Sequence, residues 1–181
     1  MEFIPVTKRE VSYSKVRALY KKAFPKKEQV PLWMLFRNVK SRNASFNALY
    51  DNGKWVGLIY TIEHNNIVMV VYLAIDETCR SGGYGSKVLT SLKEKHPGKR
   101  IVLEIEKVDD RANNYEQRLK RKNFYKKNGY QSTGYITTLL GEKFEVMFIG
   151  GSISKVDLKG LYRILMGGFL SFFFAPKFED L

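Results

Sequence analysis

The segment that most constrains this chain runs from an apolar stretch through a glycine-rich turn into a helix-like pattern, in the letters YLAIDETCRSGGYGSKVL. Glycines such as Gly82 and Gly83 permit positive φ angles and close backbone approach, so successive N–H groups can point at one anion. The helix N-terminus that follows adds partial positive charge, and Arg80 can contact phosphate oxygens with two donors at once. The segment predicts a phosphate-binding turn, although a tight turn without a ligand would look the same.

Two common phosphate-binding loops do not match this turn. The P-loop of nucleotide hydrolases ends in Gly-Lys-Ser/Thr, and the dinucleotide fingerprint needs a wider glycine spacing inside a different unit. Neither pattern is present, so neither class of nucleotide site is expected here.

Hydrophobic periodicity predicts that the first forty residues are helical. Apolar residues recur three and four positions apart up to Phe24, Pro25 ends this first helix, and Ser12 or Ser14 can cap its start. A second short helix is expected after Pro31, because proline suits the first position of a helix.

From Ala48 onwards the pattern changes to three β-rich runs, which are broken by Asp-Asn-Gly at 51–53 and by His-Asn-Asn at 64–66. Breaks of this composition are typical of hairpin turns, so the runs predict an antiparallel meander. Residues 132–140 and 142–150, which Gly141 separates, predict a second antiparallel pair.

A strand, helix and strand unit is predicted around the glycine-rich turn. Residues 86–95 carry apolar side chains on one face, and the alternation in RIVLEIE at 100–106 indicates a strand that is half exposed on one side. Such a unit has parallel neighbouring strands joined by a right-handed crossover. A further helix is expected at 109–128, with Asp109 or Asp110 as its cap and Gly129 as a left-handed residue at its end.

Length and composition favour one folded domain over residues 1–181. Apolar residues make up 44% of the chain, which is enough for a substantial core. The 31 Lys and Arg residues against 18 Asp and Glu residues give a formal net charge of +13. That charge attracts nucleic acid, an anionic membrane surface or a phosphate-rich cofactor alike, and is also compatible with a merely basic protein.

Cysteine usage and the chain ends indicate a cytoplasmic protein. Cys79 is the only cysteine, so no intramolecular disulfide can form, and no cluster of His, Cys, Asp and Glu has metal-ligand spacing. The N-terminal letters MEFIPVTKREVSYSKV lack the apolar run of a secretion signal. The apolar stretch at 165–176 is too short to span a membrane, and we expect the tail at 161–181 to complete the core or to form an interface, such as a homodimer contact.

Two ordered motifs resemble those of the GNAT N-acetyltransferases. Arg80-x-x-Gly83-x-Gly85 matches the R/Q-x-x-G-x-G/A signature, and NFYKKNGY at 123–130 resembles the aromatic-Tyr-x-x-x-Gly-aromatic ending of the family. The resemblance extends from about Ala48 to Tyr130. It implies a single mixed α/β domain with a mostly antiparallel sheet, a central parallel strand pair splayed at the cofactor site, and helices on the flanks.

The resemblance also implies acetyl-coenzyme A as the cofactor. Its pyrophosphate would lie on the backbone of the turn beside Arg80, and Tyr125 would lie near the sulfur and protonate the departing thiolate, unless Tyr125 is only a packed aromatic. Many relatives carry an asparagine seven residues before this tyrosine, where this chain has Arg118, so that cofactor contact is absent and Arg118 or Arg121 is the alternative phosphate contact. The implied cofactor-binding residues are Tyr72, Leu73, Ala74, Ile75, Arg80, Ser81, Gly82, Gly83, Tyr84, Gly85, Ser86 and Tyr125.

Direct acetyl transfer to an amine also needs a base that removes a proton. Relatives often place a carboxylate on the fourth strand, but residues 67–74 contain none. Glu104 is the first choice, because it alternates away from its apolar neighbours, although a solvated strand face would give the same pattern. Glu28, in the loop between the first two helices, is the second choice. The remaining candidates are Glu106, Glu63, His64 and His96.

The resemblance implies an N-acetyltransferase that acts on a primary amine of a small molecule or a peptide, without identifying the acceptor. Two alternatives stay open: a basic nucleic-acid-binding module, and a GNAT-like domain that senses a ligand without turnover. Nucleic acid is the less expected partner, because the lysines and arginines at 120–127 can instead flank the phosphates of coenzyme A.

Overall fold

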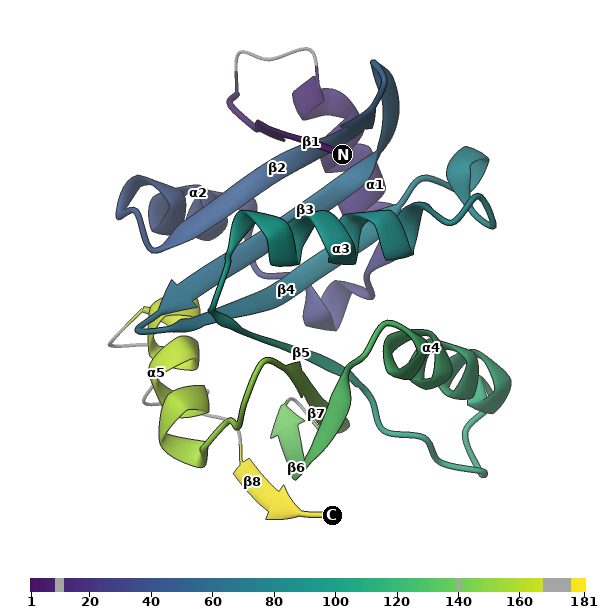
Figure 1. Cartoon of the computed structure of the whole chain (residues 1–181), viewed down its shortest axis with the longest axis vertical. Coiled ribbons are helices and arrows are strands. Elements are labelled where there is room, and N and C mark those ends of the chain that lie inside the picture. The colour runs from purple at the N-terminus through teal and green to yellow at the C-terminus, as the bar shows by residue number, and fades with distance from the viewer. Residues whose placement is uncertain (9–11, 140, 168–176) are drawn as a thin grey trace. The chain divides into compact units, whose positions relative to one another are not determined.

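The computed structural model describes residues 1–8, 12–139, 141–167 and 177–181 (Figure 1). These residues form two compact units. The N-terminal unit comprises Met1–Glu63 and Val70–Pro97, and the C-terminal unit comprises His64–Met69 and Gly98–Leu181. Residues 168–176 of the tail expected at 161–181, which include the phenylalanine-rich stretch from Phe169, lie outside the described residues, so the role of the tail stays a prediction.

The strands are ordered β1-β2-β3-β4-β5-β7-β6-β8, with β4 and β5 as the parallel pair. The pairs β1–β2, β2–β3, β5–β7, β6–β7 and β6–β8 are all antiparallel. This arrangement confirms the predicted mixed α/β class with a mostly antiparallel sheet and one parallel pair. The predicted splay of that pair stays a prediction.

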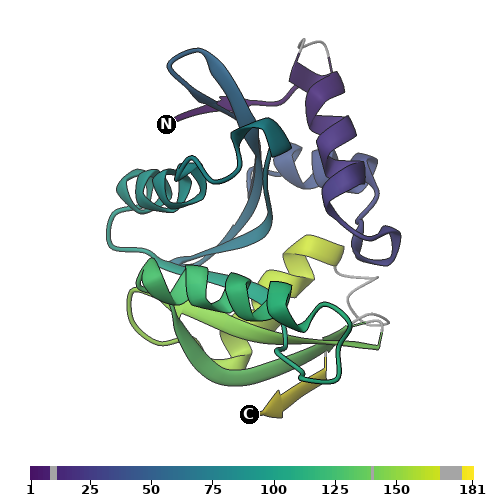
Figure 2. The same ribbon diagram turned by 90° about the vertical axis from the view of Figure 1, so that its right-hand side faces the viewer.

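In the N-terminal unit, α1 and α2 cover one face of the strands and α3 covers the other (Figures 1 and 2). The α1–α2 side is packed with aromatic rings, among them Tyr20, Tyr60 and Tyr72, which are at most 5% exposed. The elements that lie wholly or mostly in this unit are β1 (Glu2–Pro5), α1 (Ser12–Ala23), the 3-10 helix η1 (Lys26–Glu28), α2 (Leu32–Lys40), β2 (Ala44–Asp51), β3 (Lys54–His64), β4 (Ile67–Ile75), η2 (Glu77–Cys79) and α3 (Tyr84–Lys95). The first three residues of β4, at 67–69, belong to the C-terminal unit.

In the C-terminal unit, α4 and α5 lie on opposite faces of the sheet (Figure 2). Glu145 of β7 contacts Lys122 of α4. Its neighbour in β7, Val146, pairs in register with Glu104 of β5, and Glu104 contacts Tyr162 of α5. Adjacent residues of a strand point to opposite faces, so these contacts place the two helices. The elements are β5 (Arg100–Glu106), α4 (Tyr115–Lys127), β6 (Gln131–Leu139), β7 (Glu142–Ile149), α5 (Lys155–Met166) and β8 (Lys177–Asp180).

The prediction that the first forty residues form only helices was wrong, because residues 2–5 form the edge strand β1. Its four residues are too few for a period of two to stand out, and only Phe3 among them is half-buried or better. The predicted helices at α1 and α2, the three-stranded meander and the β6–β7 pair are all confirmed, with β2 beginning at Ala44 rather than Ala48.

Two further corrections concern β5 and α4. The sequence predicted a half-exposed β5, but apolar side chains on both of its faces are buried, including Val102 and Leu103, because helices cover both faces. The helix expected from 109 begins at Tyr115, and Asp109 does not cap it. The Asp109 carboxylate instead accepts the Arg111 N–H at 3.0 Å within a turn before the helix, and the N-cap position is Asn114.

Within the described ranges, no helix has the length and apolar character required to cross a membrane.

Candidate cofactor and catalytic site

The glycine-rich turn has left-handed backbone at two residues, and only one of them, Gly83, is a glycine for which the sequence predicted it; Gly82 does not have a positive φ. Ser81 has φ +63° and Gly83 has φ +74°, and Gly83 is the N-cap residue of α3. No side chain caps this helix, and its first turn carries no acidic residue. The first N–H groups of a helix have no intrahelical partner, so the start of α3 presents donors and a positive dipole end to an anion.

Three cations surround this helix start. The Arg80 side chain is 58% exposed, and its Nη1 lies 3.7 Å from Glu77 Oε1. The Nζ atoms of Lys54 and Lys87 lie 5.6 and 5.3 Å from the centroid of the Tyr84 ring. Lys54 and Lys87 were missed by sequence reasoning, since they belong to β3 and to the second turn of α3 and no short motif includes them.

The turn is held in place from β3. Asp76 caps η2 by accepting the Thr78 N–H at 3.0 Å and the Thr78 hydroxyl at 2.7 Å, and it also accepts the Trp55 indole N–H at 3.2 Å. These hydrogen bonds hold the pKa of the Asp76 carboxyl below its usual value. These hydrogen bonds therefore fix η2, the segment that leads into the glycine-rich turn, and they favour the charged form of the Asp76 carboxylate.

The end of β4 contains the predicted pantetheine contacts, Tyr72, Leu73, Ala74 and Ile75. The Tyr72 side chain points into the aromatic layer under α1, where its hydroxyl donates to the Glu28 carbonyl at 2.7 Å and accepts the Val30 N–H at 3.0 Å. This contact brings the loop with the predicted base Glu28 against β4. A role of residues 72–75 in cofactor binding would rest on their backbone groups, as predicted.

The predicted acid, Tyr125, lies on the last turn of α4. Its ring contacts Phe124 and Tyr130, with centroids 5.1 and 5.7 Å away. Burial raises the pKa of the Tyr125 phenol, and the charge of Arg121 opposes that rise. A raised pKa keeps the phenol protonated at neutral pH, which is the state a general acid must hold before transfer.

The predicted base, Glu104, is not on a solvated face. Its Oε1 accepts the Thr137 hydroxyl at 2.5 Å, and its Oε2 accepts the Tyr162 hydroxyl. Although Glu104 is only half-buried as a whole residue, its carboxylate is enclosed by protein, and burial raises its pKa while the two hydrogen bonds oppose the rise. Glu104 faces α5 and Tyr125 belongs to α4, so the two lie on opposite faces of the C-terminal sheet.

The other candidate residues have partners of their own. Glu106 binds Arg121 at 2.7 Å and Arg118 at 3.4 Å, so the two predicted alternative phosphate contacts are both engaged by one carboxylate. Glu63 lies 3.5 Å from His96 Nδ1.

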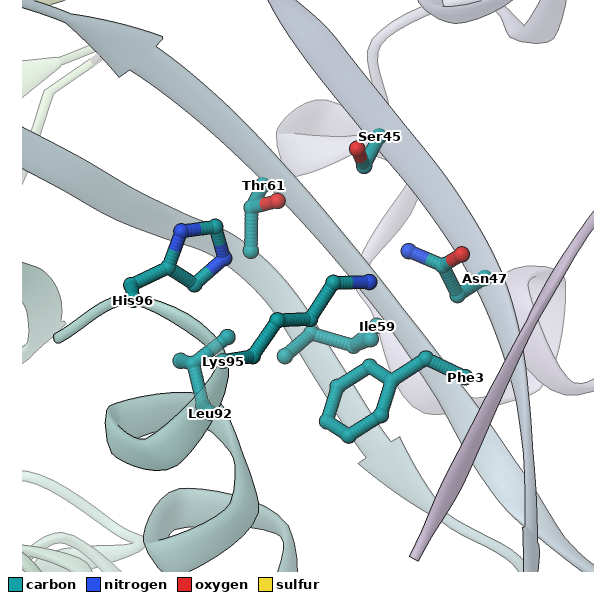
Figure 3. A pocket seen from close by; sticks show the side chains of 8 residues that line it. All are labelled: Phe3, Ser45, Asn47, Ile59, Thr61, Leu92, Lys95 and His96. Carbon is teal, nitrogen blue, oxygen red and sulfur yellow. The ribbon is translucent and has the colours of Figure 1, made fainter.

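A small pocket in the N-terminal unit contains none of the predicted catalytic or cofactor residues except the candidate His96 (Figure 3). It lies where the C-terminal end of α3 meets β1, β2 and β3. Its lining residues are Phe3, Ser45, Asn47, Ile59, Thr61, Leu92, Lys95 and His96.

Comparisons with known proteins agree with the two motifs. YjbC of Bacillus subtilis (strain 168), assigned as an acetyltransferase, is 32% identical over 105 residues, which cover 54% of this chain and 52% of YjbC. The match thus spans about half the length of that curated relative. A structure from Bacteroides thetaiotaomicron, assigned to the GNAT family as an acetyltransferase, is 26% identical with a TM-score of 0.71, covering 88% of this chain and 93% of that one.

A likeness in fold alone extends to an aminoglycoside 6'-N-acetyltransferase complexed with coenzyme A. It is 14% identical with a TM-score of 0.61, and the comparison covers 82% of this chain and 96% of that chain. The family model of the acetyltransferase (GNAT) domain matches residues 42–132, which is half of this chain and includes both sequence motifs. The chain belongs to the GNAT acetyltransferase domain family.

Proposed function

We propose that this chain transfers an acetyl group from acetyl-coenzyme A to a primary amine of a small molecule or a peptide. The observation that carries the proposal is the uncapped start of α3, where Ser81 and Gly83 hold left-handed φ angles and Arg80 stands exposed beside free N–H donors. This donor set fits a pyrophosphate, because backbone N–H groups at a helix start and a guanidinium both favour phosphate oxygens. The fold shared with an aminoglycoside acetyltransferase crystallised with coenzyme A supports it further.

Residues 80–86 would hold the pyrophosphate, and the backbone of residues 72–75 would hold the pantetheine arm. When bound, the cofactor supplies an activated acetyl thioester. The proposed role of this chain is to orient the two reactants and to move two protons: one from the attacking amine to a base, and one to the departing thiolate. In direct transfer the nitrogen–carbon bond forms as the carbon–sulfur bond breaks, so both proton movements are needed for balance.

Tyr125 is the proposed acid. Its raised pKa keeps its proton available, and its position on the last turn of α4 follows the tyrosine motif of the family. Glu104 is the first proposed base and Glu28 the second. Since both Glu104 oxygens accept hydrogen bonds, its proton would arrive through the hydroxyl of Tyr162 or Thr137.

Calorimetric titration with acetyl-coenzyme A tests the cofactor site. We expect saturable one-site binding, and Arg80→Ala should weaken it by roughly tenfold or more, because a charge-assisted hydrogen bond contributes about 1.5–3 kcal/mol. Arg17→Ala is the matched control, since Arg17 is also an exposed arginine of the same unit but lies on α1. Absence of binding, or equal weakening in both variants, would contradict the proposal.

The rate of acetyl transfer to a panel of amines then separates an enzyme from a ligand sensor. A sensor binds the cofactor and turns over no amine. A pH–rate profile of Glu104→Gln against Glu28→Gln identifies the base, because loss of the base removes the limb of kcat/KM that rises with pH.

A further inference from the structure

The outer faces of α1, η1 and α2, with the turn after them, carry an unusual charge distribution. Residues 12–50 contain nine Lys and Arg residues but a single acidic residue, Glu28. Every one of the nine basic residues is exposed. We call them, together with Trp33, the basic helical surface. Its members are Lys15, Arg17, Lys21, Lys22, Lys26, Lys27, Trp33, Arg37, Lys40 and Arg42.

These residues share one side of the N-terminal unit. α1 and α2 both pack on the strand face opposite α3, so their outer faces point away from the sheet on the same side (Figure 2). Buried residues such as Val16 and Leu19 fix the rotation of α1, and Met34 and Leu35 fix that of α2. The basic side chains are exposed on this side as a result, and Lys22 pairs at 2.7 Å with Glu77 of η2.

Trp33 is the exposed aromatic residue of this surface. It is 62% exposed, although a tryptophan is normally buried for most of its area, and the Arg37 guanidinium lies 5.7 Å from its ring centroid. Arg37 lies one turn further along α2, and Lys40 continues the same stripe of the helix. An exposed amphipathic indole beside a cation, on a helix that carries further cations, is an arrangement that binds at the headgroup level of a bilayer.

We propose that the basic helical surface docks on an anionic phospholipid membrane, with Trp33 as its interfacial anchor. Charge complementarity decides the choice of partner, because residues 12–50 contain nine exposed cations and one acidic residue. Six of the nine are lysines, which act as point charges without the planar fork of arginine. Single-stranded nucleic acid is less well matched, because its binding surfaces stack successive bases on several aromatic rings, and Trp33 is the one large aromatic counted as exposed among the described residues.

The docking surface shares no residue with the proposed acetyl-transfer site. None of its residues belongs to the glycine-rich turn, and Tyr125 and Glu104 lie in the other unit. Glu28, the second proposed base, lies in η1 beside Lys26 and Lys27 but is not a member of the surface. Failure of cofactor binding would therefore leave this proposal standing, and the reverse is also true.

The chain offers a direct reporter for the test, because it has two tryptophans and the other, Trp55, is held by a hydrogen bond to Asp76. Trp55→Phe leaves Trp33 as the only tryptophan. With vesicles of phosphatidylcholine and phosphatidylglycerol in equal parts, at about 0.1 M salt, we expect a blue shift of Trp33 fluorescence and quenching by brominated acyl chains. Vesicles of phosphatidylcholine alone should give neither.

Two double variants with the same change of net charge show whether vesicle binding depends on this surface or only on the net charge of the protein. Arg17→Gln/Lys21→Gln alters α1, and Lys159→Gln/Arg163→Gln alters exposed residues with the same spacing on α5, so each lowers the formal net charge from +13 to +11. Each cation near an anionic surface contributes about a fivefold factor in vesicle affinity, so the α1 variant should lose roughly 25-fold and the α5 variant little.

Three results would overturn the proposal. Equal losses in the two double variants would mean that only net charge matters. A shift of Trp33 fluorescence with a thymidine oligonucleotide, and none with the anionic vesicles, would assign the surface to nucleic acid. Unchanged Trp33 fluorescence with both partners would leave the surface without a role in binding either. Circular dichroism melting of each variant verifies that the compared proteins are folded.

Discussion

The Tyr162 hydroxyl donates a hydrogen bond to one carboxylate oxygen of Glu104, although the two residues lie 58 positions apart in the chain. Thr137 donates to the other oxygen, so the carboxylate is held from α5 and β6 at once. Tyr162 is 2% exposed and Thr137 is fully buried. A buried carboxylate whose oxygens are both satisfied fixes the packing of α5 on the sheet, whatever its part in catalysis.

The first prediction concerns pH and stability. Burial raises the folded-state pKa of Glu104 above its ordinary value of 4.5, so the folded chain keeps a proton that the unfolded chain has already released. The stabilising contribution of Glu104 is therefore full below about pH 4.5 and is lost as the pH rises through the raised pKa. Between about pH 4.5 and the raised pKa, the free energy of unfolding measured in urea should therefore fall less steeply with pH in Glu104→Gln than in the wild type.

A parallel set of urea curves on Tyr162→Phe provides the control. Removing one donor eliminates a hydrogen bond that lowers the pKa of Glu104, so the window of stability loss should extend to higher pH. The loss at neutral pH should be about 1.5–3 kcal/mol, since the bond is made to a charged group. Identical pH slopes in the wild type and both variants would contradict the linkage.

The second prediction concerns the buried ion pair beneath α4. Lys122 Nζ lies 2.6 Å from Glu145 Oε2, the Glu145 side chain is 2% exposed, and its buried Oε1 has no hydrogen-bond partner among the described residues. Lys122→Met should cost about 3–5 kcal/mol of unfolding free energy, because it leaves a buried charge without compensation. Lys122→Met/Glu145→Met should recover most of that loss in the same urea assay. A double variant as unstable as the single one would show that packing, not charge, sets the cost.

The third prediction follows from the proposed acid. Tyr125→Phe keeps the ring that packs on Phe124 and Tyr130 and removes the proton donor. We expect kcat to fall by about 10²-fold or more, with the affinity for acetyl-coenzyme A nearly unchanged. Steady-state kinetics and calorimetry on the same preparation separate the two. Phe124→Leu is the matched control: it alters the neighbouring ring and should change kcat far less.

Local patterns predicted most of the architecture. The spacing of three and four between Val16, Leu19 and Tyr20 predicts the buried face of α1, and the glycine turn predicts the left-handed Gly83 before α3. The helix α5 was not predicted, yet its start was readable: Ser154 and Asp157 form a reciprocal capping box before an apolar periodic run.

Long-range contacts could not be predicted in the same way. The sequence gives no reason to pair Glu104 with Thr137 and Tyr162, which lie 33 and 58 positions away, so the strand pattern alone left a solvated face as an alternative for Glu104. The register of β5 against β7 and the position of α5 determine that contact. Both depend on the packing of the whole C-terminal unit, which a window of ten residues does not contain.

The fourth prediction tests how closely β3 approaches β4 beside the proposed pantetheine strand. A Cβ placed on Gly57 would overlap the Ala74 carbonyl oxygen and would lie 3.1 Å from the Ile75 Cα, so only backbone movement could relieve the clash. Gly57→Ala should therefore cost about 1–3 kcal/mol or more in urea unfolding and should weaken binding of acetyl-coenzyme A, if residues 72–75 hold the pantetheine arm. Gly160→Ala is the control, because its Cβ would meet only the His64 side chain, which can rotate away, and alanine favours the interior of α5. A stable Gly57→Ala variant that binds the cofactor normally would mean that β4 tolerates displacement at Ala74, and would remove the backbone of this strand from the proposed site.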